Sequence, residues 1–210
     1  MILKQMTVGP LKVNCYIIGD EGSGLAVVID PGGDAEKIAT FLNQKGLTLQ
    51  SIINTHGHWD HTLANAELKK LAGGEILMHA SEDPMGVSID GHLAEGDQIE
   101  VGSLVFEVME TPGHSPGGIS LYLAEADVVF VGDLIFSRAI GRTDLPGSNQ
   151  ETLLKSIRDR IYPLPGRTMI APGHGSMTAL DWEKMSNPYL RRLRPLPGQE
   201  TEPERDPWGD

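Results

Sequence analysis

The sequence contains a single cysteine, Cys15, so no internal disulfide can form. It also lacks any apolar run of the roughly 18–20 residues that a membrane-spanning helix requires. The N-terminal segment has neither the basic region nor the long apolar core of a secretory signal peptide. These absences predict a protein without membrane partners, for which a cytoplasmic location is the simplest expectation.

Positive charge is scarce in this chain, which has 17 Lys and Arg against 29 Asp and Glu, for a formal net charge of -12. The longest basic cluster is "RRLR" at residues 191–194, which we interpret as a solvated helix end. Because nucleic-acid phosphates are bound by basic patches, we expect no nucleic-acid partner. The sequence does not predict the oligomeric state.

The 210 residues, of which 40% are hydrophobic, are enough for one large α/β domain with an ordinary core. We assign residues 1–192 to this domain and residues 193–210 to a C-terminal tail rich in proline and acidic residues. Apolar runs predict strands over residues 25–30, 49–54 and 75–80, two strands around a Val-Gly-Ser turn within 97–114, a hairpin within 117–133, and a final strand and turn over 167–175. Helical periodicity predicts helices over 35–46, 61–74, 149–164 and 178–187.

Two details of these helices can be tested. We expect Asp34 to cap the helix over residues 35–46 with its side chain. We expect Ala64, Leu68, Leu71 and Ala72 to form the buried face of the helix over 61–74. Strands and helices in this mixed order favour sheets covered by helices rather than a pure bundle or sandwich.

Histidines are concentrated in "NTHGHWDH" at residues 54–61. Alternate side chains of an extended segment lie on one side, so His56 and His58 can approach the same ion. Asp60 and His61 follow at the start of a helix, where the turn can direct them to a different point. A helix N-terminus also favours an ionised carboxylate at Asp60.

Three further stretches combine a strand, a glycine-containing turn and a ligand-type side chain. They are "ETPGHS" with His114, "FVGDLI" with Asp133 and "APGHGS" with His174. Imidazole nitrogens and carboxylate oxygens in this number can fill two adjacent sites for zinc, iron or manganese. His79 and His92 lack such a setting, and we interpret them as ordinary polar residues.

"THGHWDH" resembles the T-H-x-H-x-D-H signature of the metallo-β-lactamase superfamily. The resemblance continues through "DPGG", "TPGHSPGG", "VGDLIF", "GRTD" and "PGHG" in family order. It implies an αββα sandwich with two metals at one edge of its sheets. The implied ligands are His56, His58 and His114 at the first site, Asp60, His61 and His174 at the second, and Asp133 bridging both, with Asp60 and Asp133 as the catalytic carboxylates.

Asp30 resembles the family's supporting aspartate, which braces a ligand from behind. A plain cap at the end of a strand is the alternative interpretation of this residue.

The stretches "GDLIFSRAIGRTDLPGSN", "PGHGSMTAL" and "NPYL" resemble, more narrowly, short glyoxalase II-like (hydroxyacylglutathione hydrolase-like) enzymes. These lack the C-terminal helical domain that supplies much of the glutathione-binding surface in the long form. The resemblance implies hydrolysis of a small thioester such as S-lactoylglutathione, with zinc as the first choice of metal and iron or manganese as alternatives. The nucleophile would be a hydroxide shared by the two ions.

Substrate selection is expected from loops around the metals, with Arg142, Arg138 and Tyr189 as candidates. Arg142 can either grip a substrate carboxylate or pair with Asp144 and hold the loop. Trp59 is expected to cover the histidine cluster.

Two other functions stay open. One is a single-iron persulfide dioxygenase, which would use only His56, His114 and Asp133. The other is a metal-binding module without catalysis.

Overall fold

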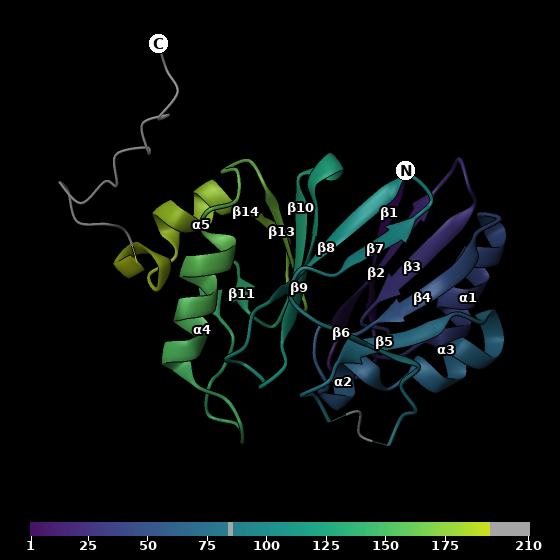
Figure 1. Cartoon of the computed structure of the whole chain (residues 1–210), viewed down its shortest axis with the longest axis horizontal. Helices are drawn as coiled ribbons and strands as arrows, with labels where there is room; N and C mark the ends of the chain where they lie inside the picture. Colours follow the sequence, from purple (N-terminus) through teal and green to yellow (C-terminus); the bar gives the residue numbers. More distant parts are fainter. Residues whose placement is uncertain (84–85, 194–210) are drawn as a thin grey trace, which may run out of the picture.

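Two facing β-sheets with helices on their outer surfaces make up the computed structural model, which describes residues 1–83 and 86–193 (Figure 1). The predicted tail over residues 193–210 lies outside the described residues except for Leu193. That residue is partly buried against an apolar cluster that includes Leu153, Ile157 and Leu180. Among the described residues, every helix falls short of the length and apolarity needed to cross a bilayer.

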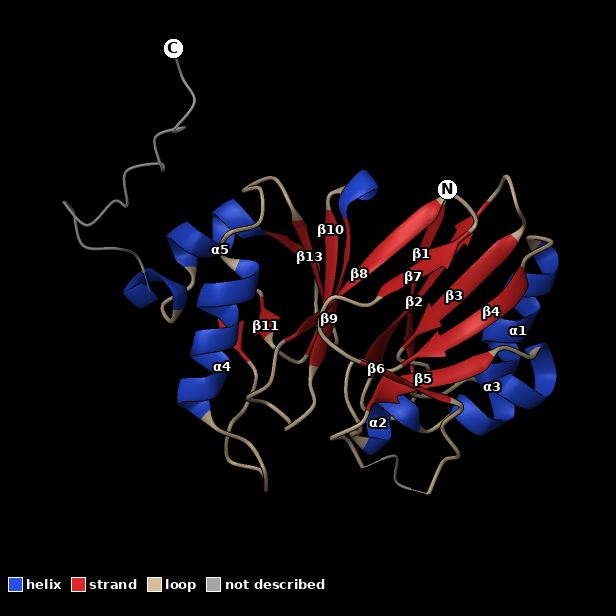
Figure 2. Ribbon diagram, in the orientation of Figure 1, coloured by secondary structure: helices blue, strands red, loops and turns tan. Residues whose placement is uncertain are grey.

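The first sheet has the strand order β1-β2-β3-β4-β5-β6. Its strands are Ile2–Val8, Val13–Asp20, Leu25–Ile29, Thr48–Ile53, Glu75–His79 and Gly91–Leu93. The first three pair antiparallel, whereas β3 to β6 are parallel neighbours. Helices α1 (Ala35–Gln44) and α3 (Asn65–Ala72) cover its outer face (Figure 2).

The second sheet has the order β14-β13-β10-β9-β8-β7. Its strands in chain order are Gln98–Val101, Leu104–Glu110, Ile119–Leu123, Val128–Gly132, Met169–Pro172 and Thr178–Ala179. The β10–β13 pair is parallel and the other pairs are antiparallel. Helices α4 (Gln150–Ser156), which continues as a π-helical turn (Ile157–Ile161), and α5 (Leu180–Ser186) cover its outer face.

Short elements complete the chain at the edges of this frame. Strands β11 (Ile135–Phe136) and β12 (Ala139–Ile140) form a separate hairpin, and α2 (Trp59–Thr62) is a single helical turn. Two 3-10 turns span Ala124–Ala126 and Leu190–Leu193.

Three apolar layers hold the sandwich together. The inner layer lies between the sheets, where Phe106, Phe130 and Ile29 are buried and Tyr16 meets the Phe130 ring edge-on at 5.1 Å. The outer layers lie beneath α1 and α3 on one side and beneath α4 and α5 on the other. Burial of apolar surface on both faces of each sheet is the main stabilising term. The predicted αββα architecture is confirmed.

The helix expected over residues 61–74 is wrong as one element, because the chain breaks after α2 and starts again at α3. Ala64 donates its backbone N–H to Pro31 O at 3.0 Å instead of continuing the first turn. Ala64 and Leu68 are buried as predicted, but Leu71 is 50% exposed. Tertiary contact with the loop after β3 therefore overrides the local helical pattern.

Asp34 precedes α1 but does not cap it with its side chain. Its backbone is left-handed, with a φ of 54°, and its carboxylate accepts from the Lys37 ammonium at Oδ1 and from Gly9 N at Oδ2, the latter at 3.0 Å. The expected side-chain cap is therefore wrong, and the carboxylate fixes the β1–β2 turn instead.

Candidate metal centre

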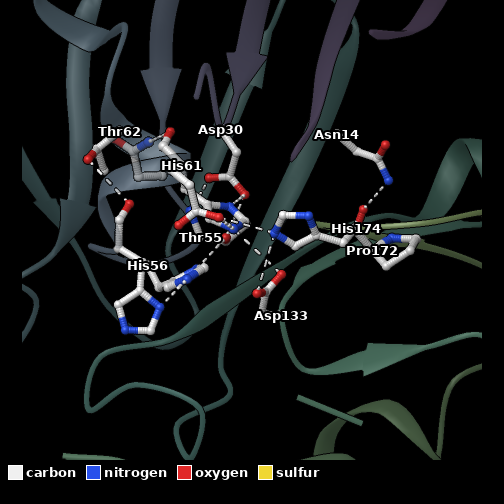
Figure 3. Close-up of polar contacts among 12 residues, drawn as sticks. Asn14, Asp30, Thr55, His56, His61, Thr62, Asp133, Pro172 and His174 are labelled. Atoms are coloured by element: carbon white, nitrogen blue, oxygen red, sulfur yellow. Dashed lines mark hydrogen bonds and ion pairs between the residues drawn. The ribbon is translucent and has the colours of Figure 1, made fainter. Parts of the chain in front are cut away.

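The predicted ligands all come directly after strands of the two sheets, in the connections at the C-terminal ends of those strands. His56 and His58 follow β4, and Asp60 and His61 lie in α2 directly afterwards. His114, Asp133 and His174 follow β8, β10 and β13 of the other sheet. Parallel neighbours such as β10 and β13 end at the same sheet edge, which brings Asp133 and His174 together (Figure 3).

Three histidines form the first group, which we call the three-histidine group: His56, His58 and His114. The Nδ1 atom of His58 lies 3.0 Å from Nε2 of His56 and 3.0 Å from Nε2 of His114. A neutral imidazole carries one N–H, so such a convergence of ring nitrogens leaves lone pairs directed at one point. This is the ligand set that a divalent ion of the zinc type accepts.

The second group, which we call the Asp60 group, contains Asp60, His61 and His174. The Oδ2 atom of Asp60 lies 3.2 Å from Nε2 of His174 and 3.7 Å from Nε2 of His61. Candidate ligand atoms within each group all lie within 4.8 Å of one another. A third set that meets the same distance limit, His56, His61 and Asp133, takes one histidine from each group. The assignment of ligands to two separate ions stays a prediction.

Asp133 lies between the two groups. Its Oδ2 is 3.7 Å from Nε2 of His114, a member of the three-histidine group, and 3.7 Å from Nε2 of His174. Its Oδ1 is 3.5 Å from Nε2 of His61. A carboxylate that faces both groups can serve as a ligand shared by two ions.

Two buried atoms at this junction fit a cation. His61 Nε2 and Asp133 Oδ1 are buried without a hydrogen-bond partner among the described residues. Leaving such polar atoms unpaired in the interior costs free energy of roughly 1–3 kcal/mol each. A metal ion coordinated by both atoms removes that cost, so the donor set supports divalent-metal binding.

Asp30 and Thr55 brace the histidines from behind (Figure 3). Asp30 Oδ2 lies 2.9 Å from Nδ1 of His61 and accepts the Thr55 hydroxyl at 2.6 Å. The Thr55 N–H also donates to Asp30 Oδ1 at 2.8 Å. When Nδ1 of His61 carries the proton donated to Asp30, Nε2 is left free to face the site. The interpretation of Asp30 as a supporting aspartate is favoured over a simple strand-end cap.

His114 is oriented in the same way by a different partner. Its Nδ1 lies 2.9 Å from the backbone oxygen of Arg142, which fixes the ring with Nε2 toward His58. Gly141, the residue before Arg142, packs against the backbone of Asp133, where a Cβ would lie 1.8 Å from Asp133 O. The "GRTD" stretch therefore supports the site through its backbone.

Burial and neighbouring charges shift the pKa values of two histidines of the site, His56 and His61, in opposite directions. Burial, followed by the neighbouring histidines, lowers the pKa of His56 well below its usual range and keeps this ring neutral. Burial also opposes charge on His61, yet Asp30 and Asp133 outweigh it and raise the pKa of His61. Burial would raise the pKa of Asp133, but His61 and the other histidines lower it. Ligation needs neutral imidazole, so a metal ion would displace the proton from His61.

Sequence reasoning missed the residues that hold the His174 loop. Asn14 in β2 donates from Nδ2 to Pro172 O at 2.9 Å and to Gly175 O at 2.8 Å. The Tyr16 hydroxyl donates to Pro172 O at 2.8 Å. The one available signal was an asparagine inside the apolar strand "VNCYII", where a buried polar group needs partners. Cys15 beside it is fully buried, as expected for a structural residue.

The two candidate substrate-binding arginines differ in whether their side chains are already paired with a carboxylate. Arg142 is engaged, since its Nε and Nη2 atoms donate to the two Asp144 oxygens at 2.7 and 2.8 Å. Arg138 is exposed at the tip of the β11–β12 hairpin, with a left-handed φ of 61°. Phe136 of the same hairpin lies 6.4 Å from His174, ring centre to ring centre. The structure thus favours the loop-holding role for Arg142.

Tyr189 and Trp59 present aromatic surface to solvent, with 39% and 43% of their area exposed. The expected cover of the histidine cluster by Trp59 stays a prediction. His79 and His92 lie outside both groups; His79 Nε2 instead lies 3.2 Å from Glu110 Oε1.

Comparison with known proteins places these features in a family. Residues 8–174 match the family model described as the metallo-beta-lactamase superfamily. The probable metallo-hydrolase YqgX of Bacillus subtilis is 38% identical over 89% of this chain and 96% of its own. Hydroxyacylglutathione hydrolase GloC of Haemophilus influenzae is 36% identical over 90% of this chain and 98% of its own. The mitochondrial persulfide dioxygenase ETHE1 of Bos taurus is 32% identical over 90% of this chain and 76% of its own.

Solved structures agree with this grouping. The BLEG-1 B3 metallo-beta-lactamase superimposes with a TM-score of 0.84 at 36% identity, over 90% of this chain and 99% of its own. TTHA1623 in a di-iron-bound form gives a TM-score of 0.80 at 34% identity, over 89% of this chain and 100% of its own.

Proposed function

The chain belongs to the metallo-beta-lactamase superfamily, and from that premise we propose that it hydrolyses small thioesters at a two-metal site. The observation that carries the proposal is Asp133, which faces a histidine of the three-histidine group and two of the Asp60 group. A single-ion enzyme has no need of a complete second group. Zinc is our first choice of metal, and iron or manganese would fit the same nitrogen and oxygen donors.

Two divalent ions held by these groups would lower the pKa of water toward neutrality and polarise a substrate carbonyl. The protein's own residues prepare the site for them. Asp30 and the Arg142 carbonyl fix two imidazoles with Nε2 inward, which avoids reorganisation when the substrate arrives. The leaving thiolate of a thioester is a weak base, so the mechanism does not require a side chain to protonate it.

Recognition of the thiol half is assigned to the loops around the metals. Because Arg142 is paired with Asp144, Arg138 is our candidate for binding a substrate carboxylate. S-lactoylglutathione is the proposed test substrate, supported by the similarity to the hydrolase GloC.

The persulfide dioxygenase remains the second candidate, since relatives named ETHE1 cover most of this chain. That chemistry would need one iron held by His56, His114 and Asp133 and would not need His61. A non-catalytic metal module is a third candidate, but it gives no reason for two complete, adjacent groups.

His61→Ala separates these candidates. In a hydrolase it should keep one metal and lose turnover of S-lactoylglutathione by on the order of 100-fold, because one ion must then do the work of two. The measurements are metal content of protein purified without added metal and kcat for the thioester. His92→Ala, at an exposed histidine of β6, is the matched control and should behave like the wild type.

Other results would favour the second or the third candidate. Oxygen consumption with glutathione persulfide, one iron per chain and retained activity in His61→Ala would replace the hydrolase with the dioxygenase. Metal binding without either activity would support the non-catalytic module.

A further inference from the structure

Glu82, which follows β5, bonds to both histidine-bearing loops of the three-histidine group. Its Oε2 accepts the Gly57 backbone N–H at 2.7 Å, and its Oε1 accepts the Gly117 N–H at 2.6 Å. Both are charge-assisted hydrogen bonds, which are shorter and stronger than neutral ones. Each oxygen of the Glu82 carboxylate thus accepts one backbone N–H group.

These donors belong to loops from different sheets. Gly57 lies between His56 and His58 after β4, and Gly117 lies in the loop that carries His114 between β8 and β9. Close to this point, Ile119 N also donates to Thr55 O at 2.8 Å. Glu82 therefore joins the two sheets where the three-histidine group is assembled.

Gly57 and Gly117 allow the Glu82 carboxylate to approach their backbone N–H groups because they carry no Cβ. A Cβ at Gly57 would lie 2.4 Å from Asp83 O and 3.0 Å from Glu82 Oε2. A Cβ at Gly117 would lie 2.4 Å from His79 Nδ1. Gly57 and Gly117 thus leave room for the segment that carries Glu82.

We propose that Glu82 is a positioning residue that sets the separation of His56 and His58 from His114 before a metal ion binds. The inference rests on the proposed function only in assigning a metal ion to this group. Partners that orient metal ligands from behind typically change metal affinity about 10–100-fold when removed. Asp30 does this for the Asp60 group through His61, and Glu82 does it for the three-histidine group through two loop backbones.

Glu82→Gln tests the proposal with little change of shape. The amide can accept from one of the two N–H groups, but its own NH2 faces the other, so the clamp opens on one side. Glu82→Asp keeps both oxygens and the charge on a shorter side chain and should recover part of the loss. Glu107→Gln, at an exposed position of β8, is the control for the loss of one negative charge.

The first measurement needs no metal. Amide hydrogen exchange in the metal-free protein should show at least one of Gly57 and Gly117 exchanging about 10-fold faster in Glu82→Gln than in Glu107→Gln. The second is stepwise zinc affinity by chelator competition. One of the two steps should weaken by about 10-fold in Glu82→Gln while the other stays within about twofold.

Equal exchange rates and equal zinc affinities in Glu82→Gln and Glu107→Gln would overturn the proposal. So would a parallel fall in both affinities together with a lower melting temperature of the metal-free protein, which indicates a general structural role. Wild-type protein that binds no zinc, iron or manganese would instead refute the proposed function, and with it the role of Glu82 in metal binding.

Discussion

At the scale of single residues, the site depends on two atoms, one on an imidazole and one on a carboxylate, that have no hydrogen-bond partner among the described residues. His61 Nε2 and Asp133 Oδ1 face each other at 3.5 Å, and both are buried. Gly173 lies against this pair, where a Cβ would come within 2.3 Å of Asp133 Oδ1 and 2.6 Å of His61 Cε1. A glycine at this position leaves room for the ligands and the ion.

Gly173→Ala should therefore displace Asp133 and His61 and weaken metal retention by about 10–100-fold, with a parallel loss of hydrolysis. Metal content after dialysis against a weak chelator checks this. Gly175→Ala is the control on the same loop, because its Cβ meets nothing within 4 Å and its φ of 76° adds only backbone strain of about 1–3 kcal/mol. Equal metal loss in both variants would indicate loop strain rather than a clash at the ligands.

At the scale of elements, short segments around the site are held by side chains from neighbouring segments. Helix α5 carries Glu183, which is fully buried and accepts three hydrogen bonds. Its donors are the Thr178 hydroxyl at 2.7 Å, Arg138 N at 2.8 Å and Asn187 Nδ2 at 2.9 Å. The β11–β12 hairpin, and Arg138 with it, is thereby fixed to α5.

Glu183→Ala should lower the free energy of unfolding by roughly 2–4 kcal/mol, because it leaves buried donors unpaired. Urea unfolding measures the change. Glu151→Ala, at an exposed glutamate of α4, should cost no more than about 0.5 kcal/mol. If the two variants unfold at the same urea concentration, the Glu183 network does not contribute to stability as the contacts imply.

At the scale of the whole molecule, the two sheets are joined at the end away from the histidines as well. Asp20 at the end of β2 accepts the Ser103 N–H and hydroxyl, both at 3.2 Å, from the β7–β8 turn of the other sheet. Hydrogen bonding by Ser23, outweighing desolvation, together with the bonds from Ser103 and Gly22 lowers the Asp20 pKa to about 2. Gly102 permits this approach, since a Cβ there would lie 2.0 Å from Asp20 Oδ2.

A carboxylate whose pKa is lowered on folding stabilises the protein above its unfolded pKa of about 3.9 and loses that contribution as pH falls toward 2. Asp20→Asn should therefore be less stable than wild type at pH 7, and the difference should shrink between pH 4 and pH 2. Urea midpoints of the metal-free proteins at several pH values test this, with Glu107→Gln as the control. A difference that stays constant from pH 7 to pH 2 would show that the charge on Asp20 is not responsible.

The sequence by itself determined the strands that end at the site, because short apolar runs bounded by glycine are local signals. It also determined the ligand types, since the histidines and aspartates follow those strands directly. The division into a three-histidine group and an Asp60 group, with Asp133 between them, came from the resemblance and stays a prediction, although these side chains do lie close together.

Only the tertiary structure decided which partners hold these ligands. The pairing of Arg142 with Asp144, the break between α2 and α3, and the bonds from Asn14 and Glu82 to distant loops have no periodic signature. Each depends on how two sheets pack and on where a buried polar group finds a donor or acceptor far away in the chain. Local patterns fix each strand, whereas the packing of the sheets selects the contacts between them.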